Sequence, residues 1–351
     1  MGYDMYKKKT NYEERDYQQE LTNKFIQRIE LALSSIENGL SWDKPFVGSS
    51  EFPRNALTGE KYHGANIAAL MVEEFPDPRW LTFNQIQELS KKLDKPLHLE
   101  KGSKATFIMK VVVAYQKDAN GEVIKDDRGQ PLPLTHDDGT PKIGFKWYPV
   151  FNASQVVGLD NYEKKINPDV KPFETVTLLQ QALMERTGLK IEHNNQGKAA
   201  YSSELHKIYM PKHELFKSSE GYADTFLHEA GHSTGPALGR KMGNQFGSKE
   251  YAYEELVAEL TSSFMSVELG IPHNPSTHEN QAAYLKSWLE ALKNDKTMIT
   301  KASNLASKAT EYQMEHFNEY KKSLTIGQEE QVEEKEKVVA IRKSTPAVMR
   351  M

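Results

Sequence analysis

The sequence predicts an α+β protein with two domains: a mixed α/β amino-terminal domain, then a domain built around a helix that carries metal ligands. Three observations support this prediction. The chain has 351 residues, enough for two cores. Apolar residues recur at helical spacing in both halves, and two runs in the first half are rich in the β-branched and aromatic residues typical of strands.

The amino-terminal half is expected to begin with a long helix and to continue with alternating helices and strands. Leu21, Phe25, Ile29 and Leu33 lie at helical spacing, which predicts a helix over residues 12–37. Further helices are expected at residues 65–74 and at 82–93 with Thr82 as the cap, strands at 105–115 and 143–151, and a flexible hairpin loop at 117–141.

A charged segment with two prolines, residues 161–173, is the predicted linker to the second domain. Beyond it we expect helices at 174–188, 251–269, 281–292 and 301–320, and a short hairpin from 199–201 and 207–210. We expect residues 206–210 to form an edge strand on which an extended peptide could pair. The predicted domains are residues 1–165 and 171–322, and residues 323–351 form a charged tail, either flexible or a solitary helix.

The sequence HEAGH, residues 228–232, predicts a zinc hydrolase. Residues four apart share one face of a helix, so His228 and His232 can bind one Zn²⁺. Glu229 lies between them and is suited to transfer a proton. The alternative is a pair of solvated surface histidines. Glycine and proline at positions 235 and 236 are expected to end this helix.

A catalytic zinc needs a third protein ligand. A third histidine six residues after the second would mark a three-histidine peptidase, but that position is Leu238. The helix expected at 251–269 offers Glu254, Glu255 and Glu259 instead. We choose Glu255 as ligand and Glu259 as the acceptor that orients a ligand imidazole, because they lie one turn apart. The small Ala258 between them leaves room for the first helix to approach. Glu254 is expected to face solvent.

In the expected chemistry, zinc activates a water molecule and polarises a peptide carbonyl. Glu229 would accept the proton and hand it to the leaving amine. The oxyanion usually needs one more donor. Tyr251 and Tyr253 are the first candidates, and the sequence does not rank them against Tyr222, His206 and His213.

These motifs carry a family resemblance. The runs HEAGHSTG, YAYEELVAEL and AAYLKSWLEALKND resemble the zincin-like metallopeptidase domain of the ArdC antirestriction proteins. The second of these runs also resembles the Glu-x-x-Ala-Asp/Asn helix of zincins with a glutamate ligand, and this is the ground for placing the third ligand at Glu255.

The amino-terminal half is similar to the first domain of the same family. The matching runs are PRNALTGEKYHGANIAAL, DPRWLTFNQ, a Lys-Gly pair and FNASQVVGL, so the resemblance covers roughly residues 12–322. It implies a domain that binds single-stranded DNA, as do related domains on TraC-type plasmid primases. The residues expected to contact DNA are Arg54, Asn55, Tyr62, Arg79, Trp80, Lys101 and Lys104.

Charge and composition limit the other possibilities. The net charge of −4 argues against a general electrostatic grip on nucleic acid, but residues 91–117 hold seven lysines against two acids. Aromatic residues interleave with this stretch and suit base stacking; the alternative is core rings beside a solvated face. The absence of cysteine leaves only histidine and carboxylate metal ligands. Neither a membrane span nor a signal peptide is expected, and a cytoplasmic location is.

The sequence therefore predicts a single-stranded DNA-binding protein with a zinc peptidase, acting in antirestriction or protection of mobile DNA. Its partners would be single-stranded DNA and a protein substrate or restriction enzyme, without a membrane. One alternative is a DNA-binding or interaction protein whose zinc site is structural and never cleaves. Another is a zinc peptidase that cuts one regulator and needs no DNA.

Overall fold

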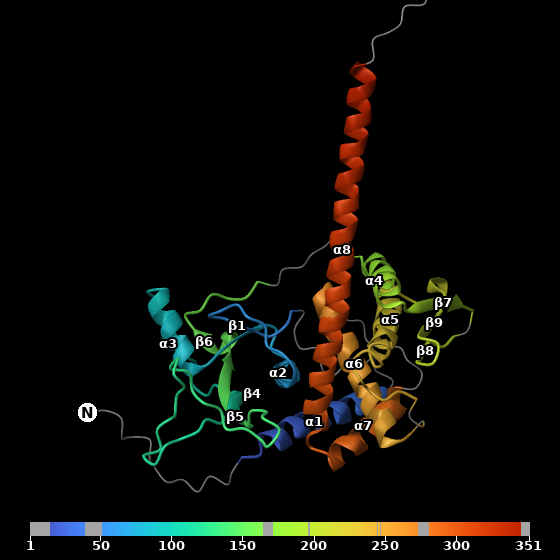
Figure 1. Cartoon of the computed structure of the whole chain (residues 1–351). Helices are drawn as coiled ribbons and strands as arrows, with labels where there is room; N and C mark the ends of the chain where they lie inside the picture. The colour runs from blue at the N-terminus through green and yellow to red at the C-terminus, as the bar shows by residue number, and fades with distance from the viewer. Residues whose placement is uncertain are drawn as a thin grey trace, which may run out of the picture. The chain divides into compact units, whose positions relative to one another are not determined.

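In a computed structural model, the chain forms two compact units (Figure 1). Unit 1 comprises Met1–Lys165 and Asn280–Asn304, and unit 2 comprises Ile166–Glu279 and Leu305–Met351. The structure describes residues 15–38, 51–163, 171–195, 197–243, 245, 247–272 and 281–344. Part of the expected linker, residues 164–170, lies outside the described residues. So do the first residues of the expected amino-terminal helix, 12–14, and the end of the expected tail, 345–351.

Unit 1 is a small sheet with helices packed around it. Its helices are α1 (Tyr17–Glu37), α2 (Ala65–Met71), α3 (Phe83–Lys92) and α7 (Gln281–Asn294), and its main strands are β1 (Arg54–Asn55), β2 (Arg79–Leu81), β4 (Thr106–Val113) and β5 (Ile143–Asn152). Two further short strands, β3 (His98–Leu99) and β6 (Val156–Val157), pair with each other. The helix α1 buries Leu21, Phe25, Ile29 and Leu33, as their spacing predicts, and packs against α7.

The sheet of unit 1 has the order β1-β2-β5-β4. β1 pairs with β2 in parallel, and the other pairs are antiparallel, with β4 and β5 in register from Thr106 opposite Val150 to Val113 opposite Ile143. Both strands that the sequence predicted at 105–115 and 143–151 are therefore present. Residues on one face of these strands alternate with residues on the other, so Phe107 shares a face with its second neighbours along β4.

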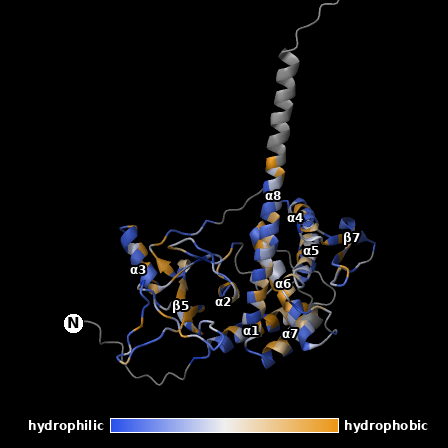
Figure 2. Ribbon diagram, in the orientation of Figure 1, coloured by the Kyte–Doolittle hydropathy of each residue, from blue (hydrophilic) through white to orange (hydrophobic). Residues whose placement is uncertain are grey.

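The helix α3 begins where its cap predicts. Thr82 accepts a hydrogen bond from the backbone of Gln85, and the Gln85 side chain accepts one from the backbone of Thr82, which completes a capping box. Only Ile86 and Leu89 of α3 are buried, and Figure 2 accordingly shows this helix as largely hydrophilic. The helix covers the sheet with one narrow apolar stripe.

The segment between β4 and β5 forms three tight turns joined by short paired arms, so it is more regular than the single loop that the sequence predicted. Gly121, Gly129 and Gly139 take positive φ angles of 83°, 79° and 82°. Asp118 and Asp126 each accept two backbone hydrogen bonds from their own turn. Backbone hydrogen bonds then join the arms between the turns. In the first two turns an aspartate lies three residues before the glycine and supplies the turn residue that precedes the left-handed one, which sequence composition alone reads as a loop.

Unit 2 places a three-stranded sheet beside packed helices. Its elements are α4 (Pro172–Thr187), β7 (Lys190–Asn194), β8 (Ala200–Ser202), β9 (Lys207–Pro211), α5 (Ser219–Ser233), α6 (Lys249–Leu269) and the part of α8 (Met298–Ser344) that follows Asn304. α4 starts at Pro172, a position where the missing proline N–H is not needed. α8 continues as a helix through residues 323–344, so this part of the expected tail takes the helical alternative.

The sheet of unit 2 corrects the expected edge strand. Its order is β7-β9-β8, so β9 is the central strand and has partners on both sides. The reason is β7, which the sequence did not reveal as a strand and which pairs with β9 in parallel from Lys190 opposite Lys207 onward. β8 is an edge strand, and it lies against α5. An extended peptide could therefore add to β8 but not to β9.

The core of unit 2 surrounds the helix that carries the HEAGH sequence. Tyr222, Phe226 and Ala230 are at most 1% exposed and form the apolar face that their spacing predicts. α6 is buried on nearly all sides from Glu254 to Ser266. Among the described residues, no helix is long and apolar enough to cross a membrane.

Candidate metal centre

The two helices α5 and α6 approach each other closely at a glycine. A Cβ atom on Gly231 would lie 3.1 Å from the Cα atom of Ala258 and 3.2 Å from its carbonyl oxygen. A Cβ atom here would force the facing backbone to shift by a few tenths of an ångström, so glycine allows this close approach, and the small Ala258 faces it, as the sequence predicted. The close approach brings carboxylates of α6 within reach of the two histidines of α5.

His228, His232 and Glu255 converge on one point, with one potential ligand atom from each lying within 4.8 Å of the other two. Glu255 bridges the two rings: Oε2 lies 3.4 Å from Nε2 of His228, and Oε1 lies 3.5 Å from Nε2 of His232. In a tetrahedral site with metal–ligand bonds of about 2.0–2.1 Å, neighbouring ligand atoms are about 3.3–3.4 Å apart. The three side chains therefore fit a single divalent metal ion.

Both imidazole rings are oriented from behind by a second carboxylate. Nδ1 of His228 lies 3.2 Å from Oε2 of Glu259, the acceptor that the sequence suggested. Nδ1 of His232 lies 3.1 Å from Oε1 of Glu254. A carboxylate at Nδ1 keeps the proton on that nitrogen and leaves Nε2 free to bind a metal. The expectation that Glu254 faces solvent is wrong, because this residue is 7% exposed and holds the second imidazole.

Arg240, which the sequence did not predict as part of this site, explains why Glu254 can be buried. Its Nε and Nη2 atoms donate to the two oxygens of Glu254 at 3.0 and 2.9 Å. Nη2 also donates to the carbonyl of Gly231 and Nη1 to the hydroxyl of Thr234, both at 2.8 Å. Arg240 thus neutralises the buried carboxylate and caps the end of α5. It lies in a loop without periodicity, so its spacing in the sequence gives no signal of this role.

The charged side chains of this centre pair with one another. Burial alone would lower the pKa of His228, but hydrogen bonds to Glu255 and Glu259 and the nearby charges of Glu255 and Glu229 raise that pKa well above its usual 6.5. Burial would raise the pKa of Glu254, but hydrogen bonds from His232 and Arg240 hold it below its usual value. Both shifts favour the charged forms of these side chains, which pair with one another.

Glu229 is placed beside these ligands and stays available. It is half-buried, and among the described residues it forms no hydrogen bond or ion pair with another side chain. Tyr251 donates a side-chain hydrogen bond to Glu255 and so reaches the centre. Burial raises the pKa of Glu255, and this hydrogen bond is one of the contacts that hold that pKa below its usual value. Tyr253 is half-buried two residues further along α6.

Two of the other three candidate donors for an oxyanion are already engaged in hydrogen bonds. The hydroxyl of Tyr222 accepts a hydrogen bond from Gln180 and lies 2.7 Å from Nε2 of His193. Nδ1 of His206 lies 2.9 Å from the Tyr201 hydroxyl. The ring of His213 packs against Phe173 with 4.1 Å between centroids, and its Nε2 is buried without a hydrogen-bond partner among the described residues. The hydrogen bonds of Tyr222 and His206 favour Tyr251 over these two.

The residues that were expected to contact DNA all lie in unit 1. Two of them are exposed lysines, and the other five are engaged in contacts within the unit. Lys101 and Lys104 are exposed. Trp80 is 1% exposed and packs against Leu70 and Val150 in the core, which does not favour it as a side chain that stacks on bases. Arg79 donates to Asp77 at 2.8 and 3.0 Å and to the carbonyl of Asp160 at 2.7 Å.

The remaining three candidates surround β1. Arg54 pairs with Glu51. The Asn55 side chain accepts backbone hydrogen bonds from Leu57 and Thr58 and so shapes the turn after β1. Tyr62 is partly buried against the core of unit 1. These side chains help to build the turn-rich segment around β1. The side chains of Lys101 and Lys104 form no hydrogen bond or ion pair with the residues that the structure describes.

Two family models match the chain. Residues 15–142 match the N-terminal domain of the anti-restriction factor ArdC, and residues 179–305 match a zincin-like metallopeptidase domain. The chain is also similar to the crystal structures of the antirestriction protein ArdC from plasmid R388. The metal-free form is 28% identical with a TM-score of 0.59, covering 84% of this chain and 98% of that one. The Mn(II)-bound form is 29% identical with a TM-score of 0.57, covering 84% and 97%.

Curated relatives agree with these matches. A DNA primase TraC of Escherichia coli is 31% identical over 282 residues, which is 77% of this chain and 25% of the primase. The uncharacterized protein y4eC of Sinorhizobium fredii is 26% identical over 303 residues, covering 85% of this chain and 91% of that protein. The chain spans a quarter or less of the length of the two TraC primases that it matches.

Proposed function

This chain belongs to the ArdC-like family of antirestriction proteins, and on that premise we propose that it is a single-stranded DNA-binding protein with a zinc peptidase centre. Its biological role would be to protect mobile DNA from restriction. The observation that carries the peptidase part of the proposal is the convergence of His228, His232 and Glu255, each imidazole being backed by its own carboxylate. Outer carboxylates that orient the ligand histidines are usual in metal sites, so this arrangement suits a bound divalent ion.

Zinc is the proposed metal, because two imidazoles and one carboxylate form the three-ligand set of glutamate-ligand zinc peptidases. The related structure from plasmid R388 binds Mn(II), so a measurement has to compare the two ions. When bound, the ion would lower the pKa of a water molecule and polarise a peptide carbonyl.

The side chains supply the proton transfers. Glu229 is half-buried and unengaged, so its carboxylate can accept a proton from the water and return it to the leaving amine. Tyr251 is the proposed donor to the developing oxyanion, because its side chain already reaches Glu255. The edge strand β8 lies against α5 and offers backbone groups to an extended peptide.

The DNA-binding part of the proposal rests on the surface of unit 1. All seven lysines between residues 91 and 117 are exposed. On β5, Phe145 and Tyr148 are 56% and 37% exposed, and Tyr115 is 39% exposed. Exposed rings beside cations are the usual means of holding single strands without reading their sequence. The cytoplasmic location expected from the sequence remains a prediction.

The proposal is tested on the full chain with two assays. Fluorescein-labelled casein reports peptidase activity after loading with Zn²⁺ or Mn²⁺, and anisotropy of a labelled oligo(dT) reports DNA binding at two salt concentrations. We expect metal-dependent cleavage that Glu229→Gln abolishes while its metal content stays unchanged. Cleavage that persists in Glu229→Gln would contradict the assigned base. Zinc and DNA binding without any cleavage would support the alternative of a structural zinc site.

A further inference from the structure

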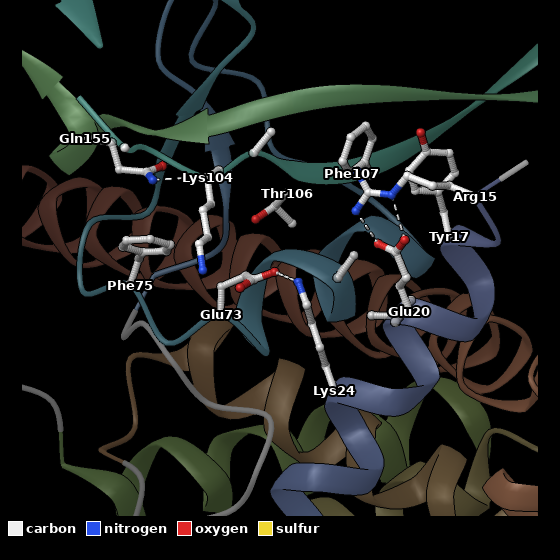
Figure 3. Close-up of a pocket in the computed structure, with 14 residues that line it drawn as sticks. Arg15, Tyr17, Glu20, Lys24, Glu73, Phe75, Lys104, Thr106, Phe107 and Gln155 are labelled. Carbon is white, nitrogen blue, oxygen red and sulfur yellow. Dashed lines mark hydrogen bonds and ion pairs between the residues drawn. The ribbon is translucent and has the colours of Figure 1, made fainter. Parts of the chain in front are cut away.

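Unit 1 contains a cavity of 810 Å³ that is distinct from the metal centre. It lies between the start of α1, the turn that follows α2 and the segment that leads into β4 (Figure 3). A volume of this size falls within the range of about 300–1,000 Å³ that small-molecule sites occupy. The cavity is therefore large enough for a ligand of one or two nucleotides.

Aromatic rings line two parts of this cavity. Tyr17 and Phe107 pack together with 4.3 Å between their ring centroids. Phe75 lines the cavity next to Lys104, and its ring meets Trp80 edge-on at 5.4 Å, which fixes the ring at the wall (Figure 3). Flat rings at the wall of an open cavity present faces on which an unpaired base can stack.

Three cationic side chains line the cavity, and two of them are paired with glutamates. Lys24 pairs with Glu73, and Arg15 pairs with Glu20 at 2.7 Å. Lys104 is exposed and extends into the cavity, and among the described residues its amino group has no acidic partner (Figure 3). An unpaired ammonium group beside aromatic faces favours a ligand that joins an anionic group to a flat ring.

We propose that this cavity binds one or two consecutive nucleotides of single-stranded DNA, with a phosphate on Lys104 and a base against Phe75. The inference rests on the proposed function and gives the DNA a specific site within unit 1. Duplex DNA does not fit the proposal, because its bases are stacked on one another and offer no free face.

The test measures binding of a fluorescein-labelled twelve-nucleotide oligo(dT) to the full chain by anisotropy at several salt concentrations. Lys104→Ala is compared with Lys142→Ala, which changes an exposed lysine of unit 1 that lies outside residues 91–117 and does not line the cavity. Phe75→Leu is compared with Phe83→Leu, whose ring is 52% exposed on α3. Thermal unfolding of each variant shows whether a loss of binding merely follows a loss of folding.

We expect Phe75→Leu to weaken binding about tenfold, since stacking on a ring contributes at this level. Lys104→Ala should weaken binding severalfold and make the slope of log K against log salt shallower by about 0.7, the loss of one phosphate contact on a single strand. The two control variants should bind like the unaltered chain. If the unaltered chain binds and all four variants bind equally well, the cavity is not the site. If the unaltered chain fails to bind, the DNA-binding function itself is overturned.

Discussion

Glu254 and Glu255 are consecutive in α6, yet both bind the same imidazole from opposite sides. Glu255 lies 3.5 Å from Nε2 of His232, and Glu254 lies 3.1 Å from its Nδ1. The first carboxylate and the ring could bind one metal ion together, and the second would fix the tautomer that leaves Nε2 free for it. Arg240 also donates hydrogen bonds to Glu254 and to the carbonyl of Gly231. The position of His232 is therefore tied to the end of α5, the helix that carries it.

Removing Glu254 should therefore weaken metal binding and folding together. We expect Glu254→Ala to lower zinc affinity about 10–100-fold, the usual effect of losing an outer partner of a ligand histidine. It should also cost roughly 3–5 kcal/mol of stability, because Arg240, only 4% exposed at its side chain, loses its buried partner. Zinc competition with a chelating dye and chemical unfolding measure the two effects. Glu250→Ala, an exposed position in the first turn of α6, serves as control and should change neither.

The pH dependence of metal binding should extend to higher pH than at a site of ordinary histidines. Hydrogen bonds to Glu255 and Glu259, which outweigh burial, raise the pKa of His228 well above 6.5 in the metal-free protein. A metal ion must displace that proton, so below the raised pKa the affinity should fall about tenfold per pH unit as pH decreases. Affinity should rise with pH above 6.5 until His228 is neutral. A zinc affinity that stays constant between about pH 6.5 and 8 would contradict the pairing of His228 with these two carboxylates.

The contact between Gly231 and Ala258 should tolerate no added side chain. Glycine to alanine normally stabilises a helix by up to about 1 kcal/mol. Here the new Cβ atom would press on backbone atoms of α6 at 3.1 and 3.2 Å, so we expect Gly231→Ala to destabilise by about 1–3 kcal/mol. Gly221→Ala is the matched control, because it meets only the Ser218 hydroxyl at 3.3 Å. Comparable unfolding midpoints for the two variants would show that the helices can separate without cost.

Arg79 and Lys101 were both expected to contact DNA, and the structure separates their roles. Arg79 donates to Asp77, whose side chain is only 6% exposed. Arg79→Ala should therefore cost about 1.5–3 kcal/mol of stability, the contribution of a hydrogen bond to a charged group. Lys101→Ala removes an exposed cation and should weaken oligo(dT) binding without changing stability. Unfolding and anisotropy measured on both variants check this; equal stability of the two would argue against the structural role of Arg79.

The sequence predicted the parts of the metal centre that follow helical spacing. His228 and His232 share a face because they are four residues apart, and Glu255 and Glu259 lie one turn apart on α6. Glu254 and Arg240 were missed for different reasons. Consecutive residues of a helix point in different directions, so Glu254 was expected to face solvent beside Glu255. Its burial depends on the guanidinium of Arg240, a residue outside any helix or strand. Long-range pairing of this kind leaves no local pattern in the chain.

The fold shows the same division between local and distant effects. The cap at Thr82 and the spacing of Leu21 and Phe25 act within a few residues, and both predicted their helices. The place of β9 depends on a parallel partner, β7, that lies before it in the chain and pairs through tertiary contacts. Its central position could not be read from the strand itself. The first two turns between β4 and β5 could have been predicted from the sequence, because in each of them an aspartate precedes a glycine by three residues.

The central claim is that α5 and α6 together build one metal site whose third ligand is Glu255. The most direct test is the zinc affinity of Glu255→Ala relative to the unaltered full chain, measured by competition with a chelating dye at constant pH. We expect one zinc ion per unaltered chain and a loss of more than about hundredfold in affinity for the variant, beyond what an outer partner contributes. An unaltered chain that binds no zinc, or a Glu255→Ala variant that binds it equally well, would contradict the claim.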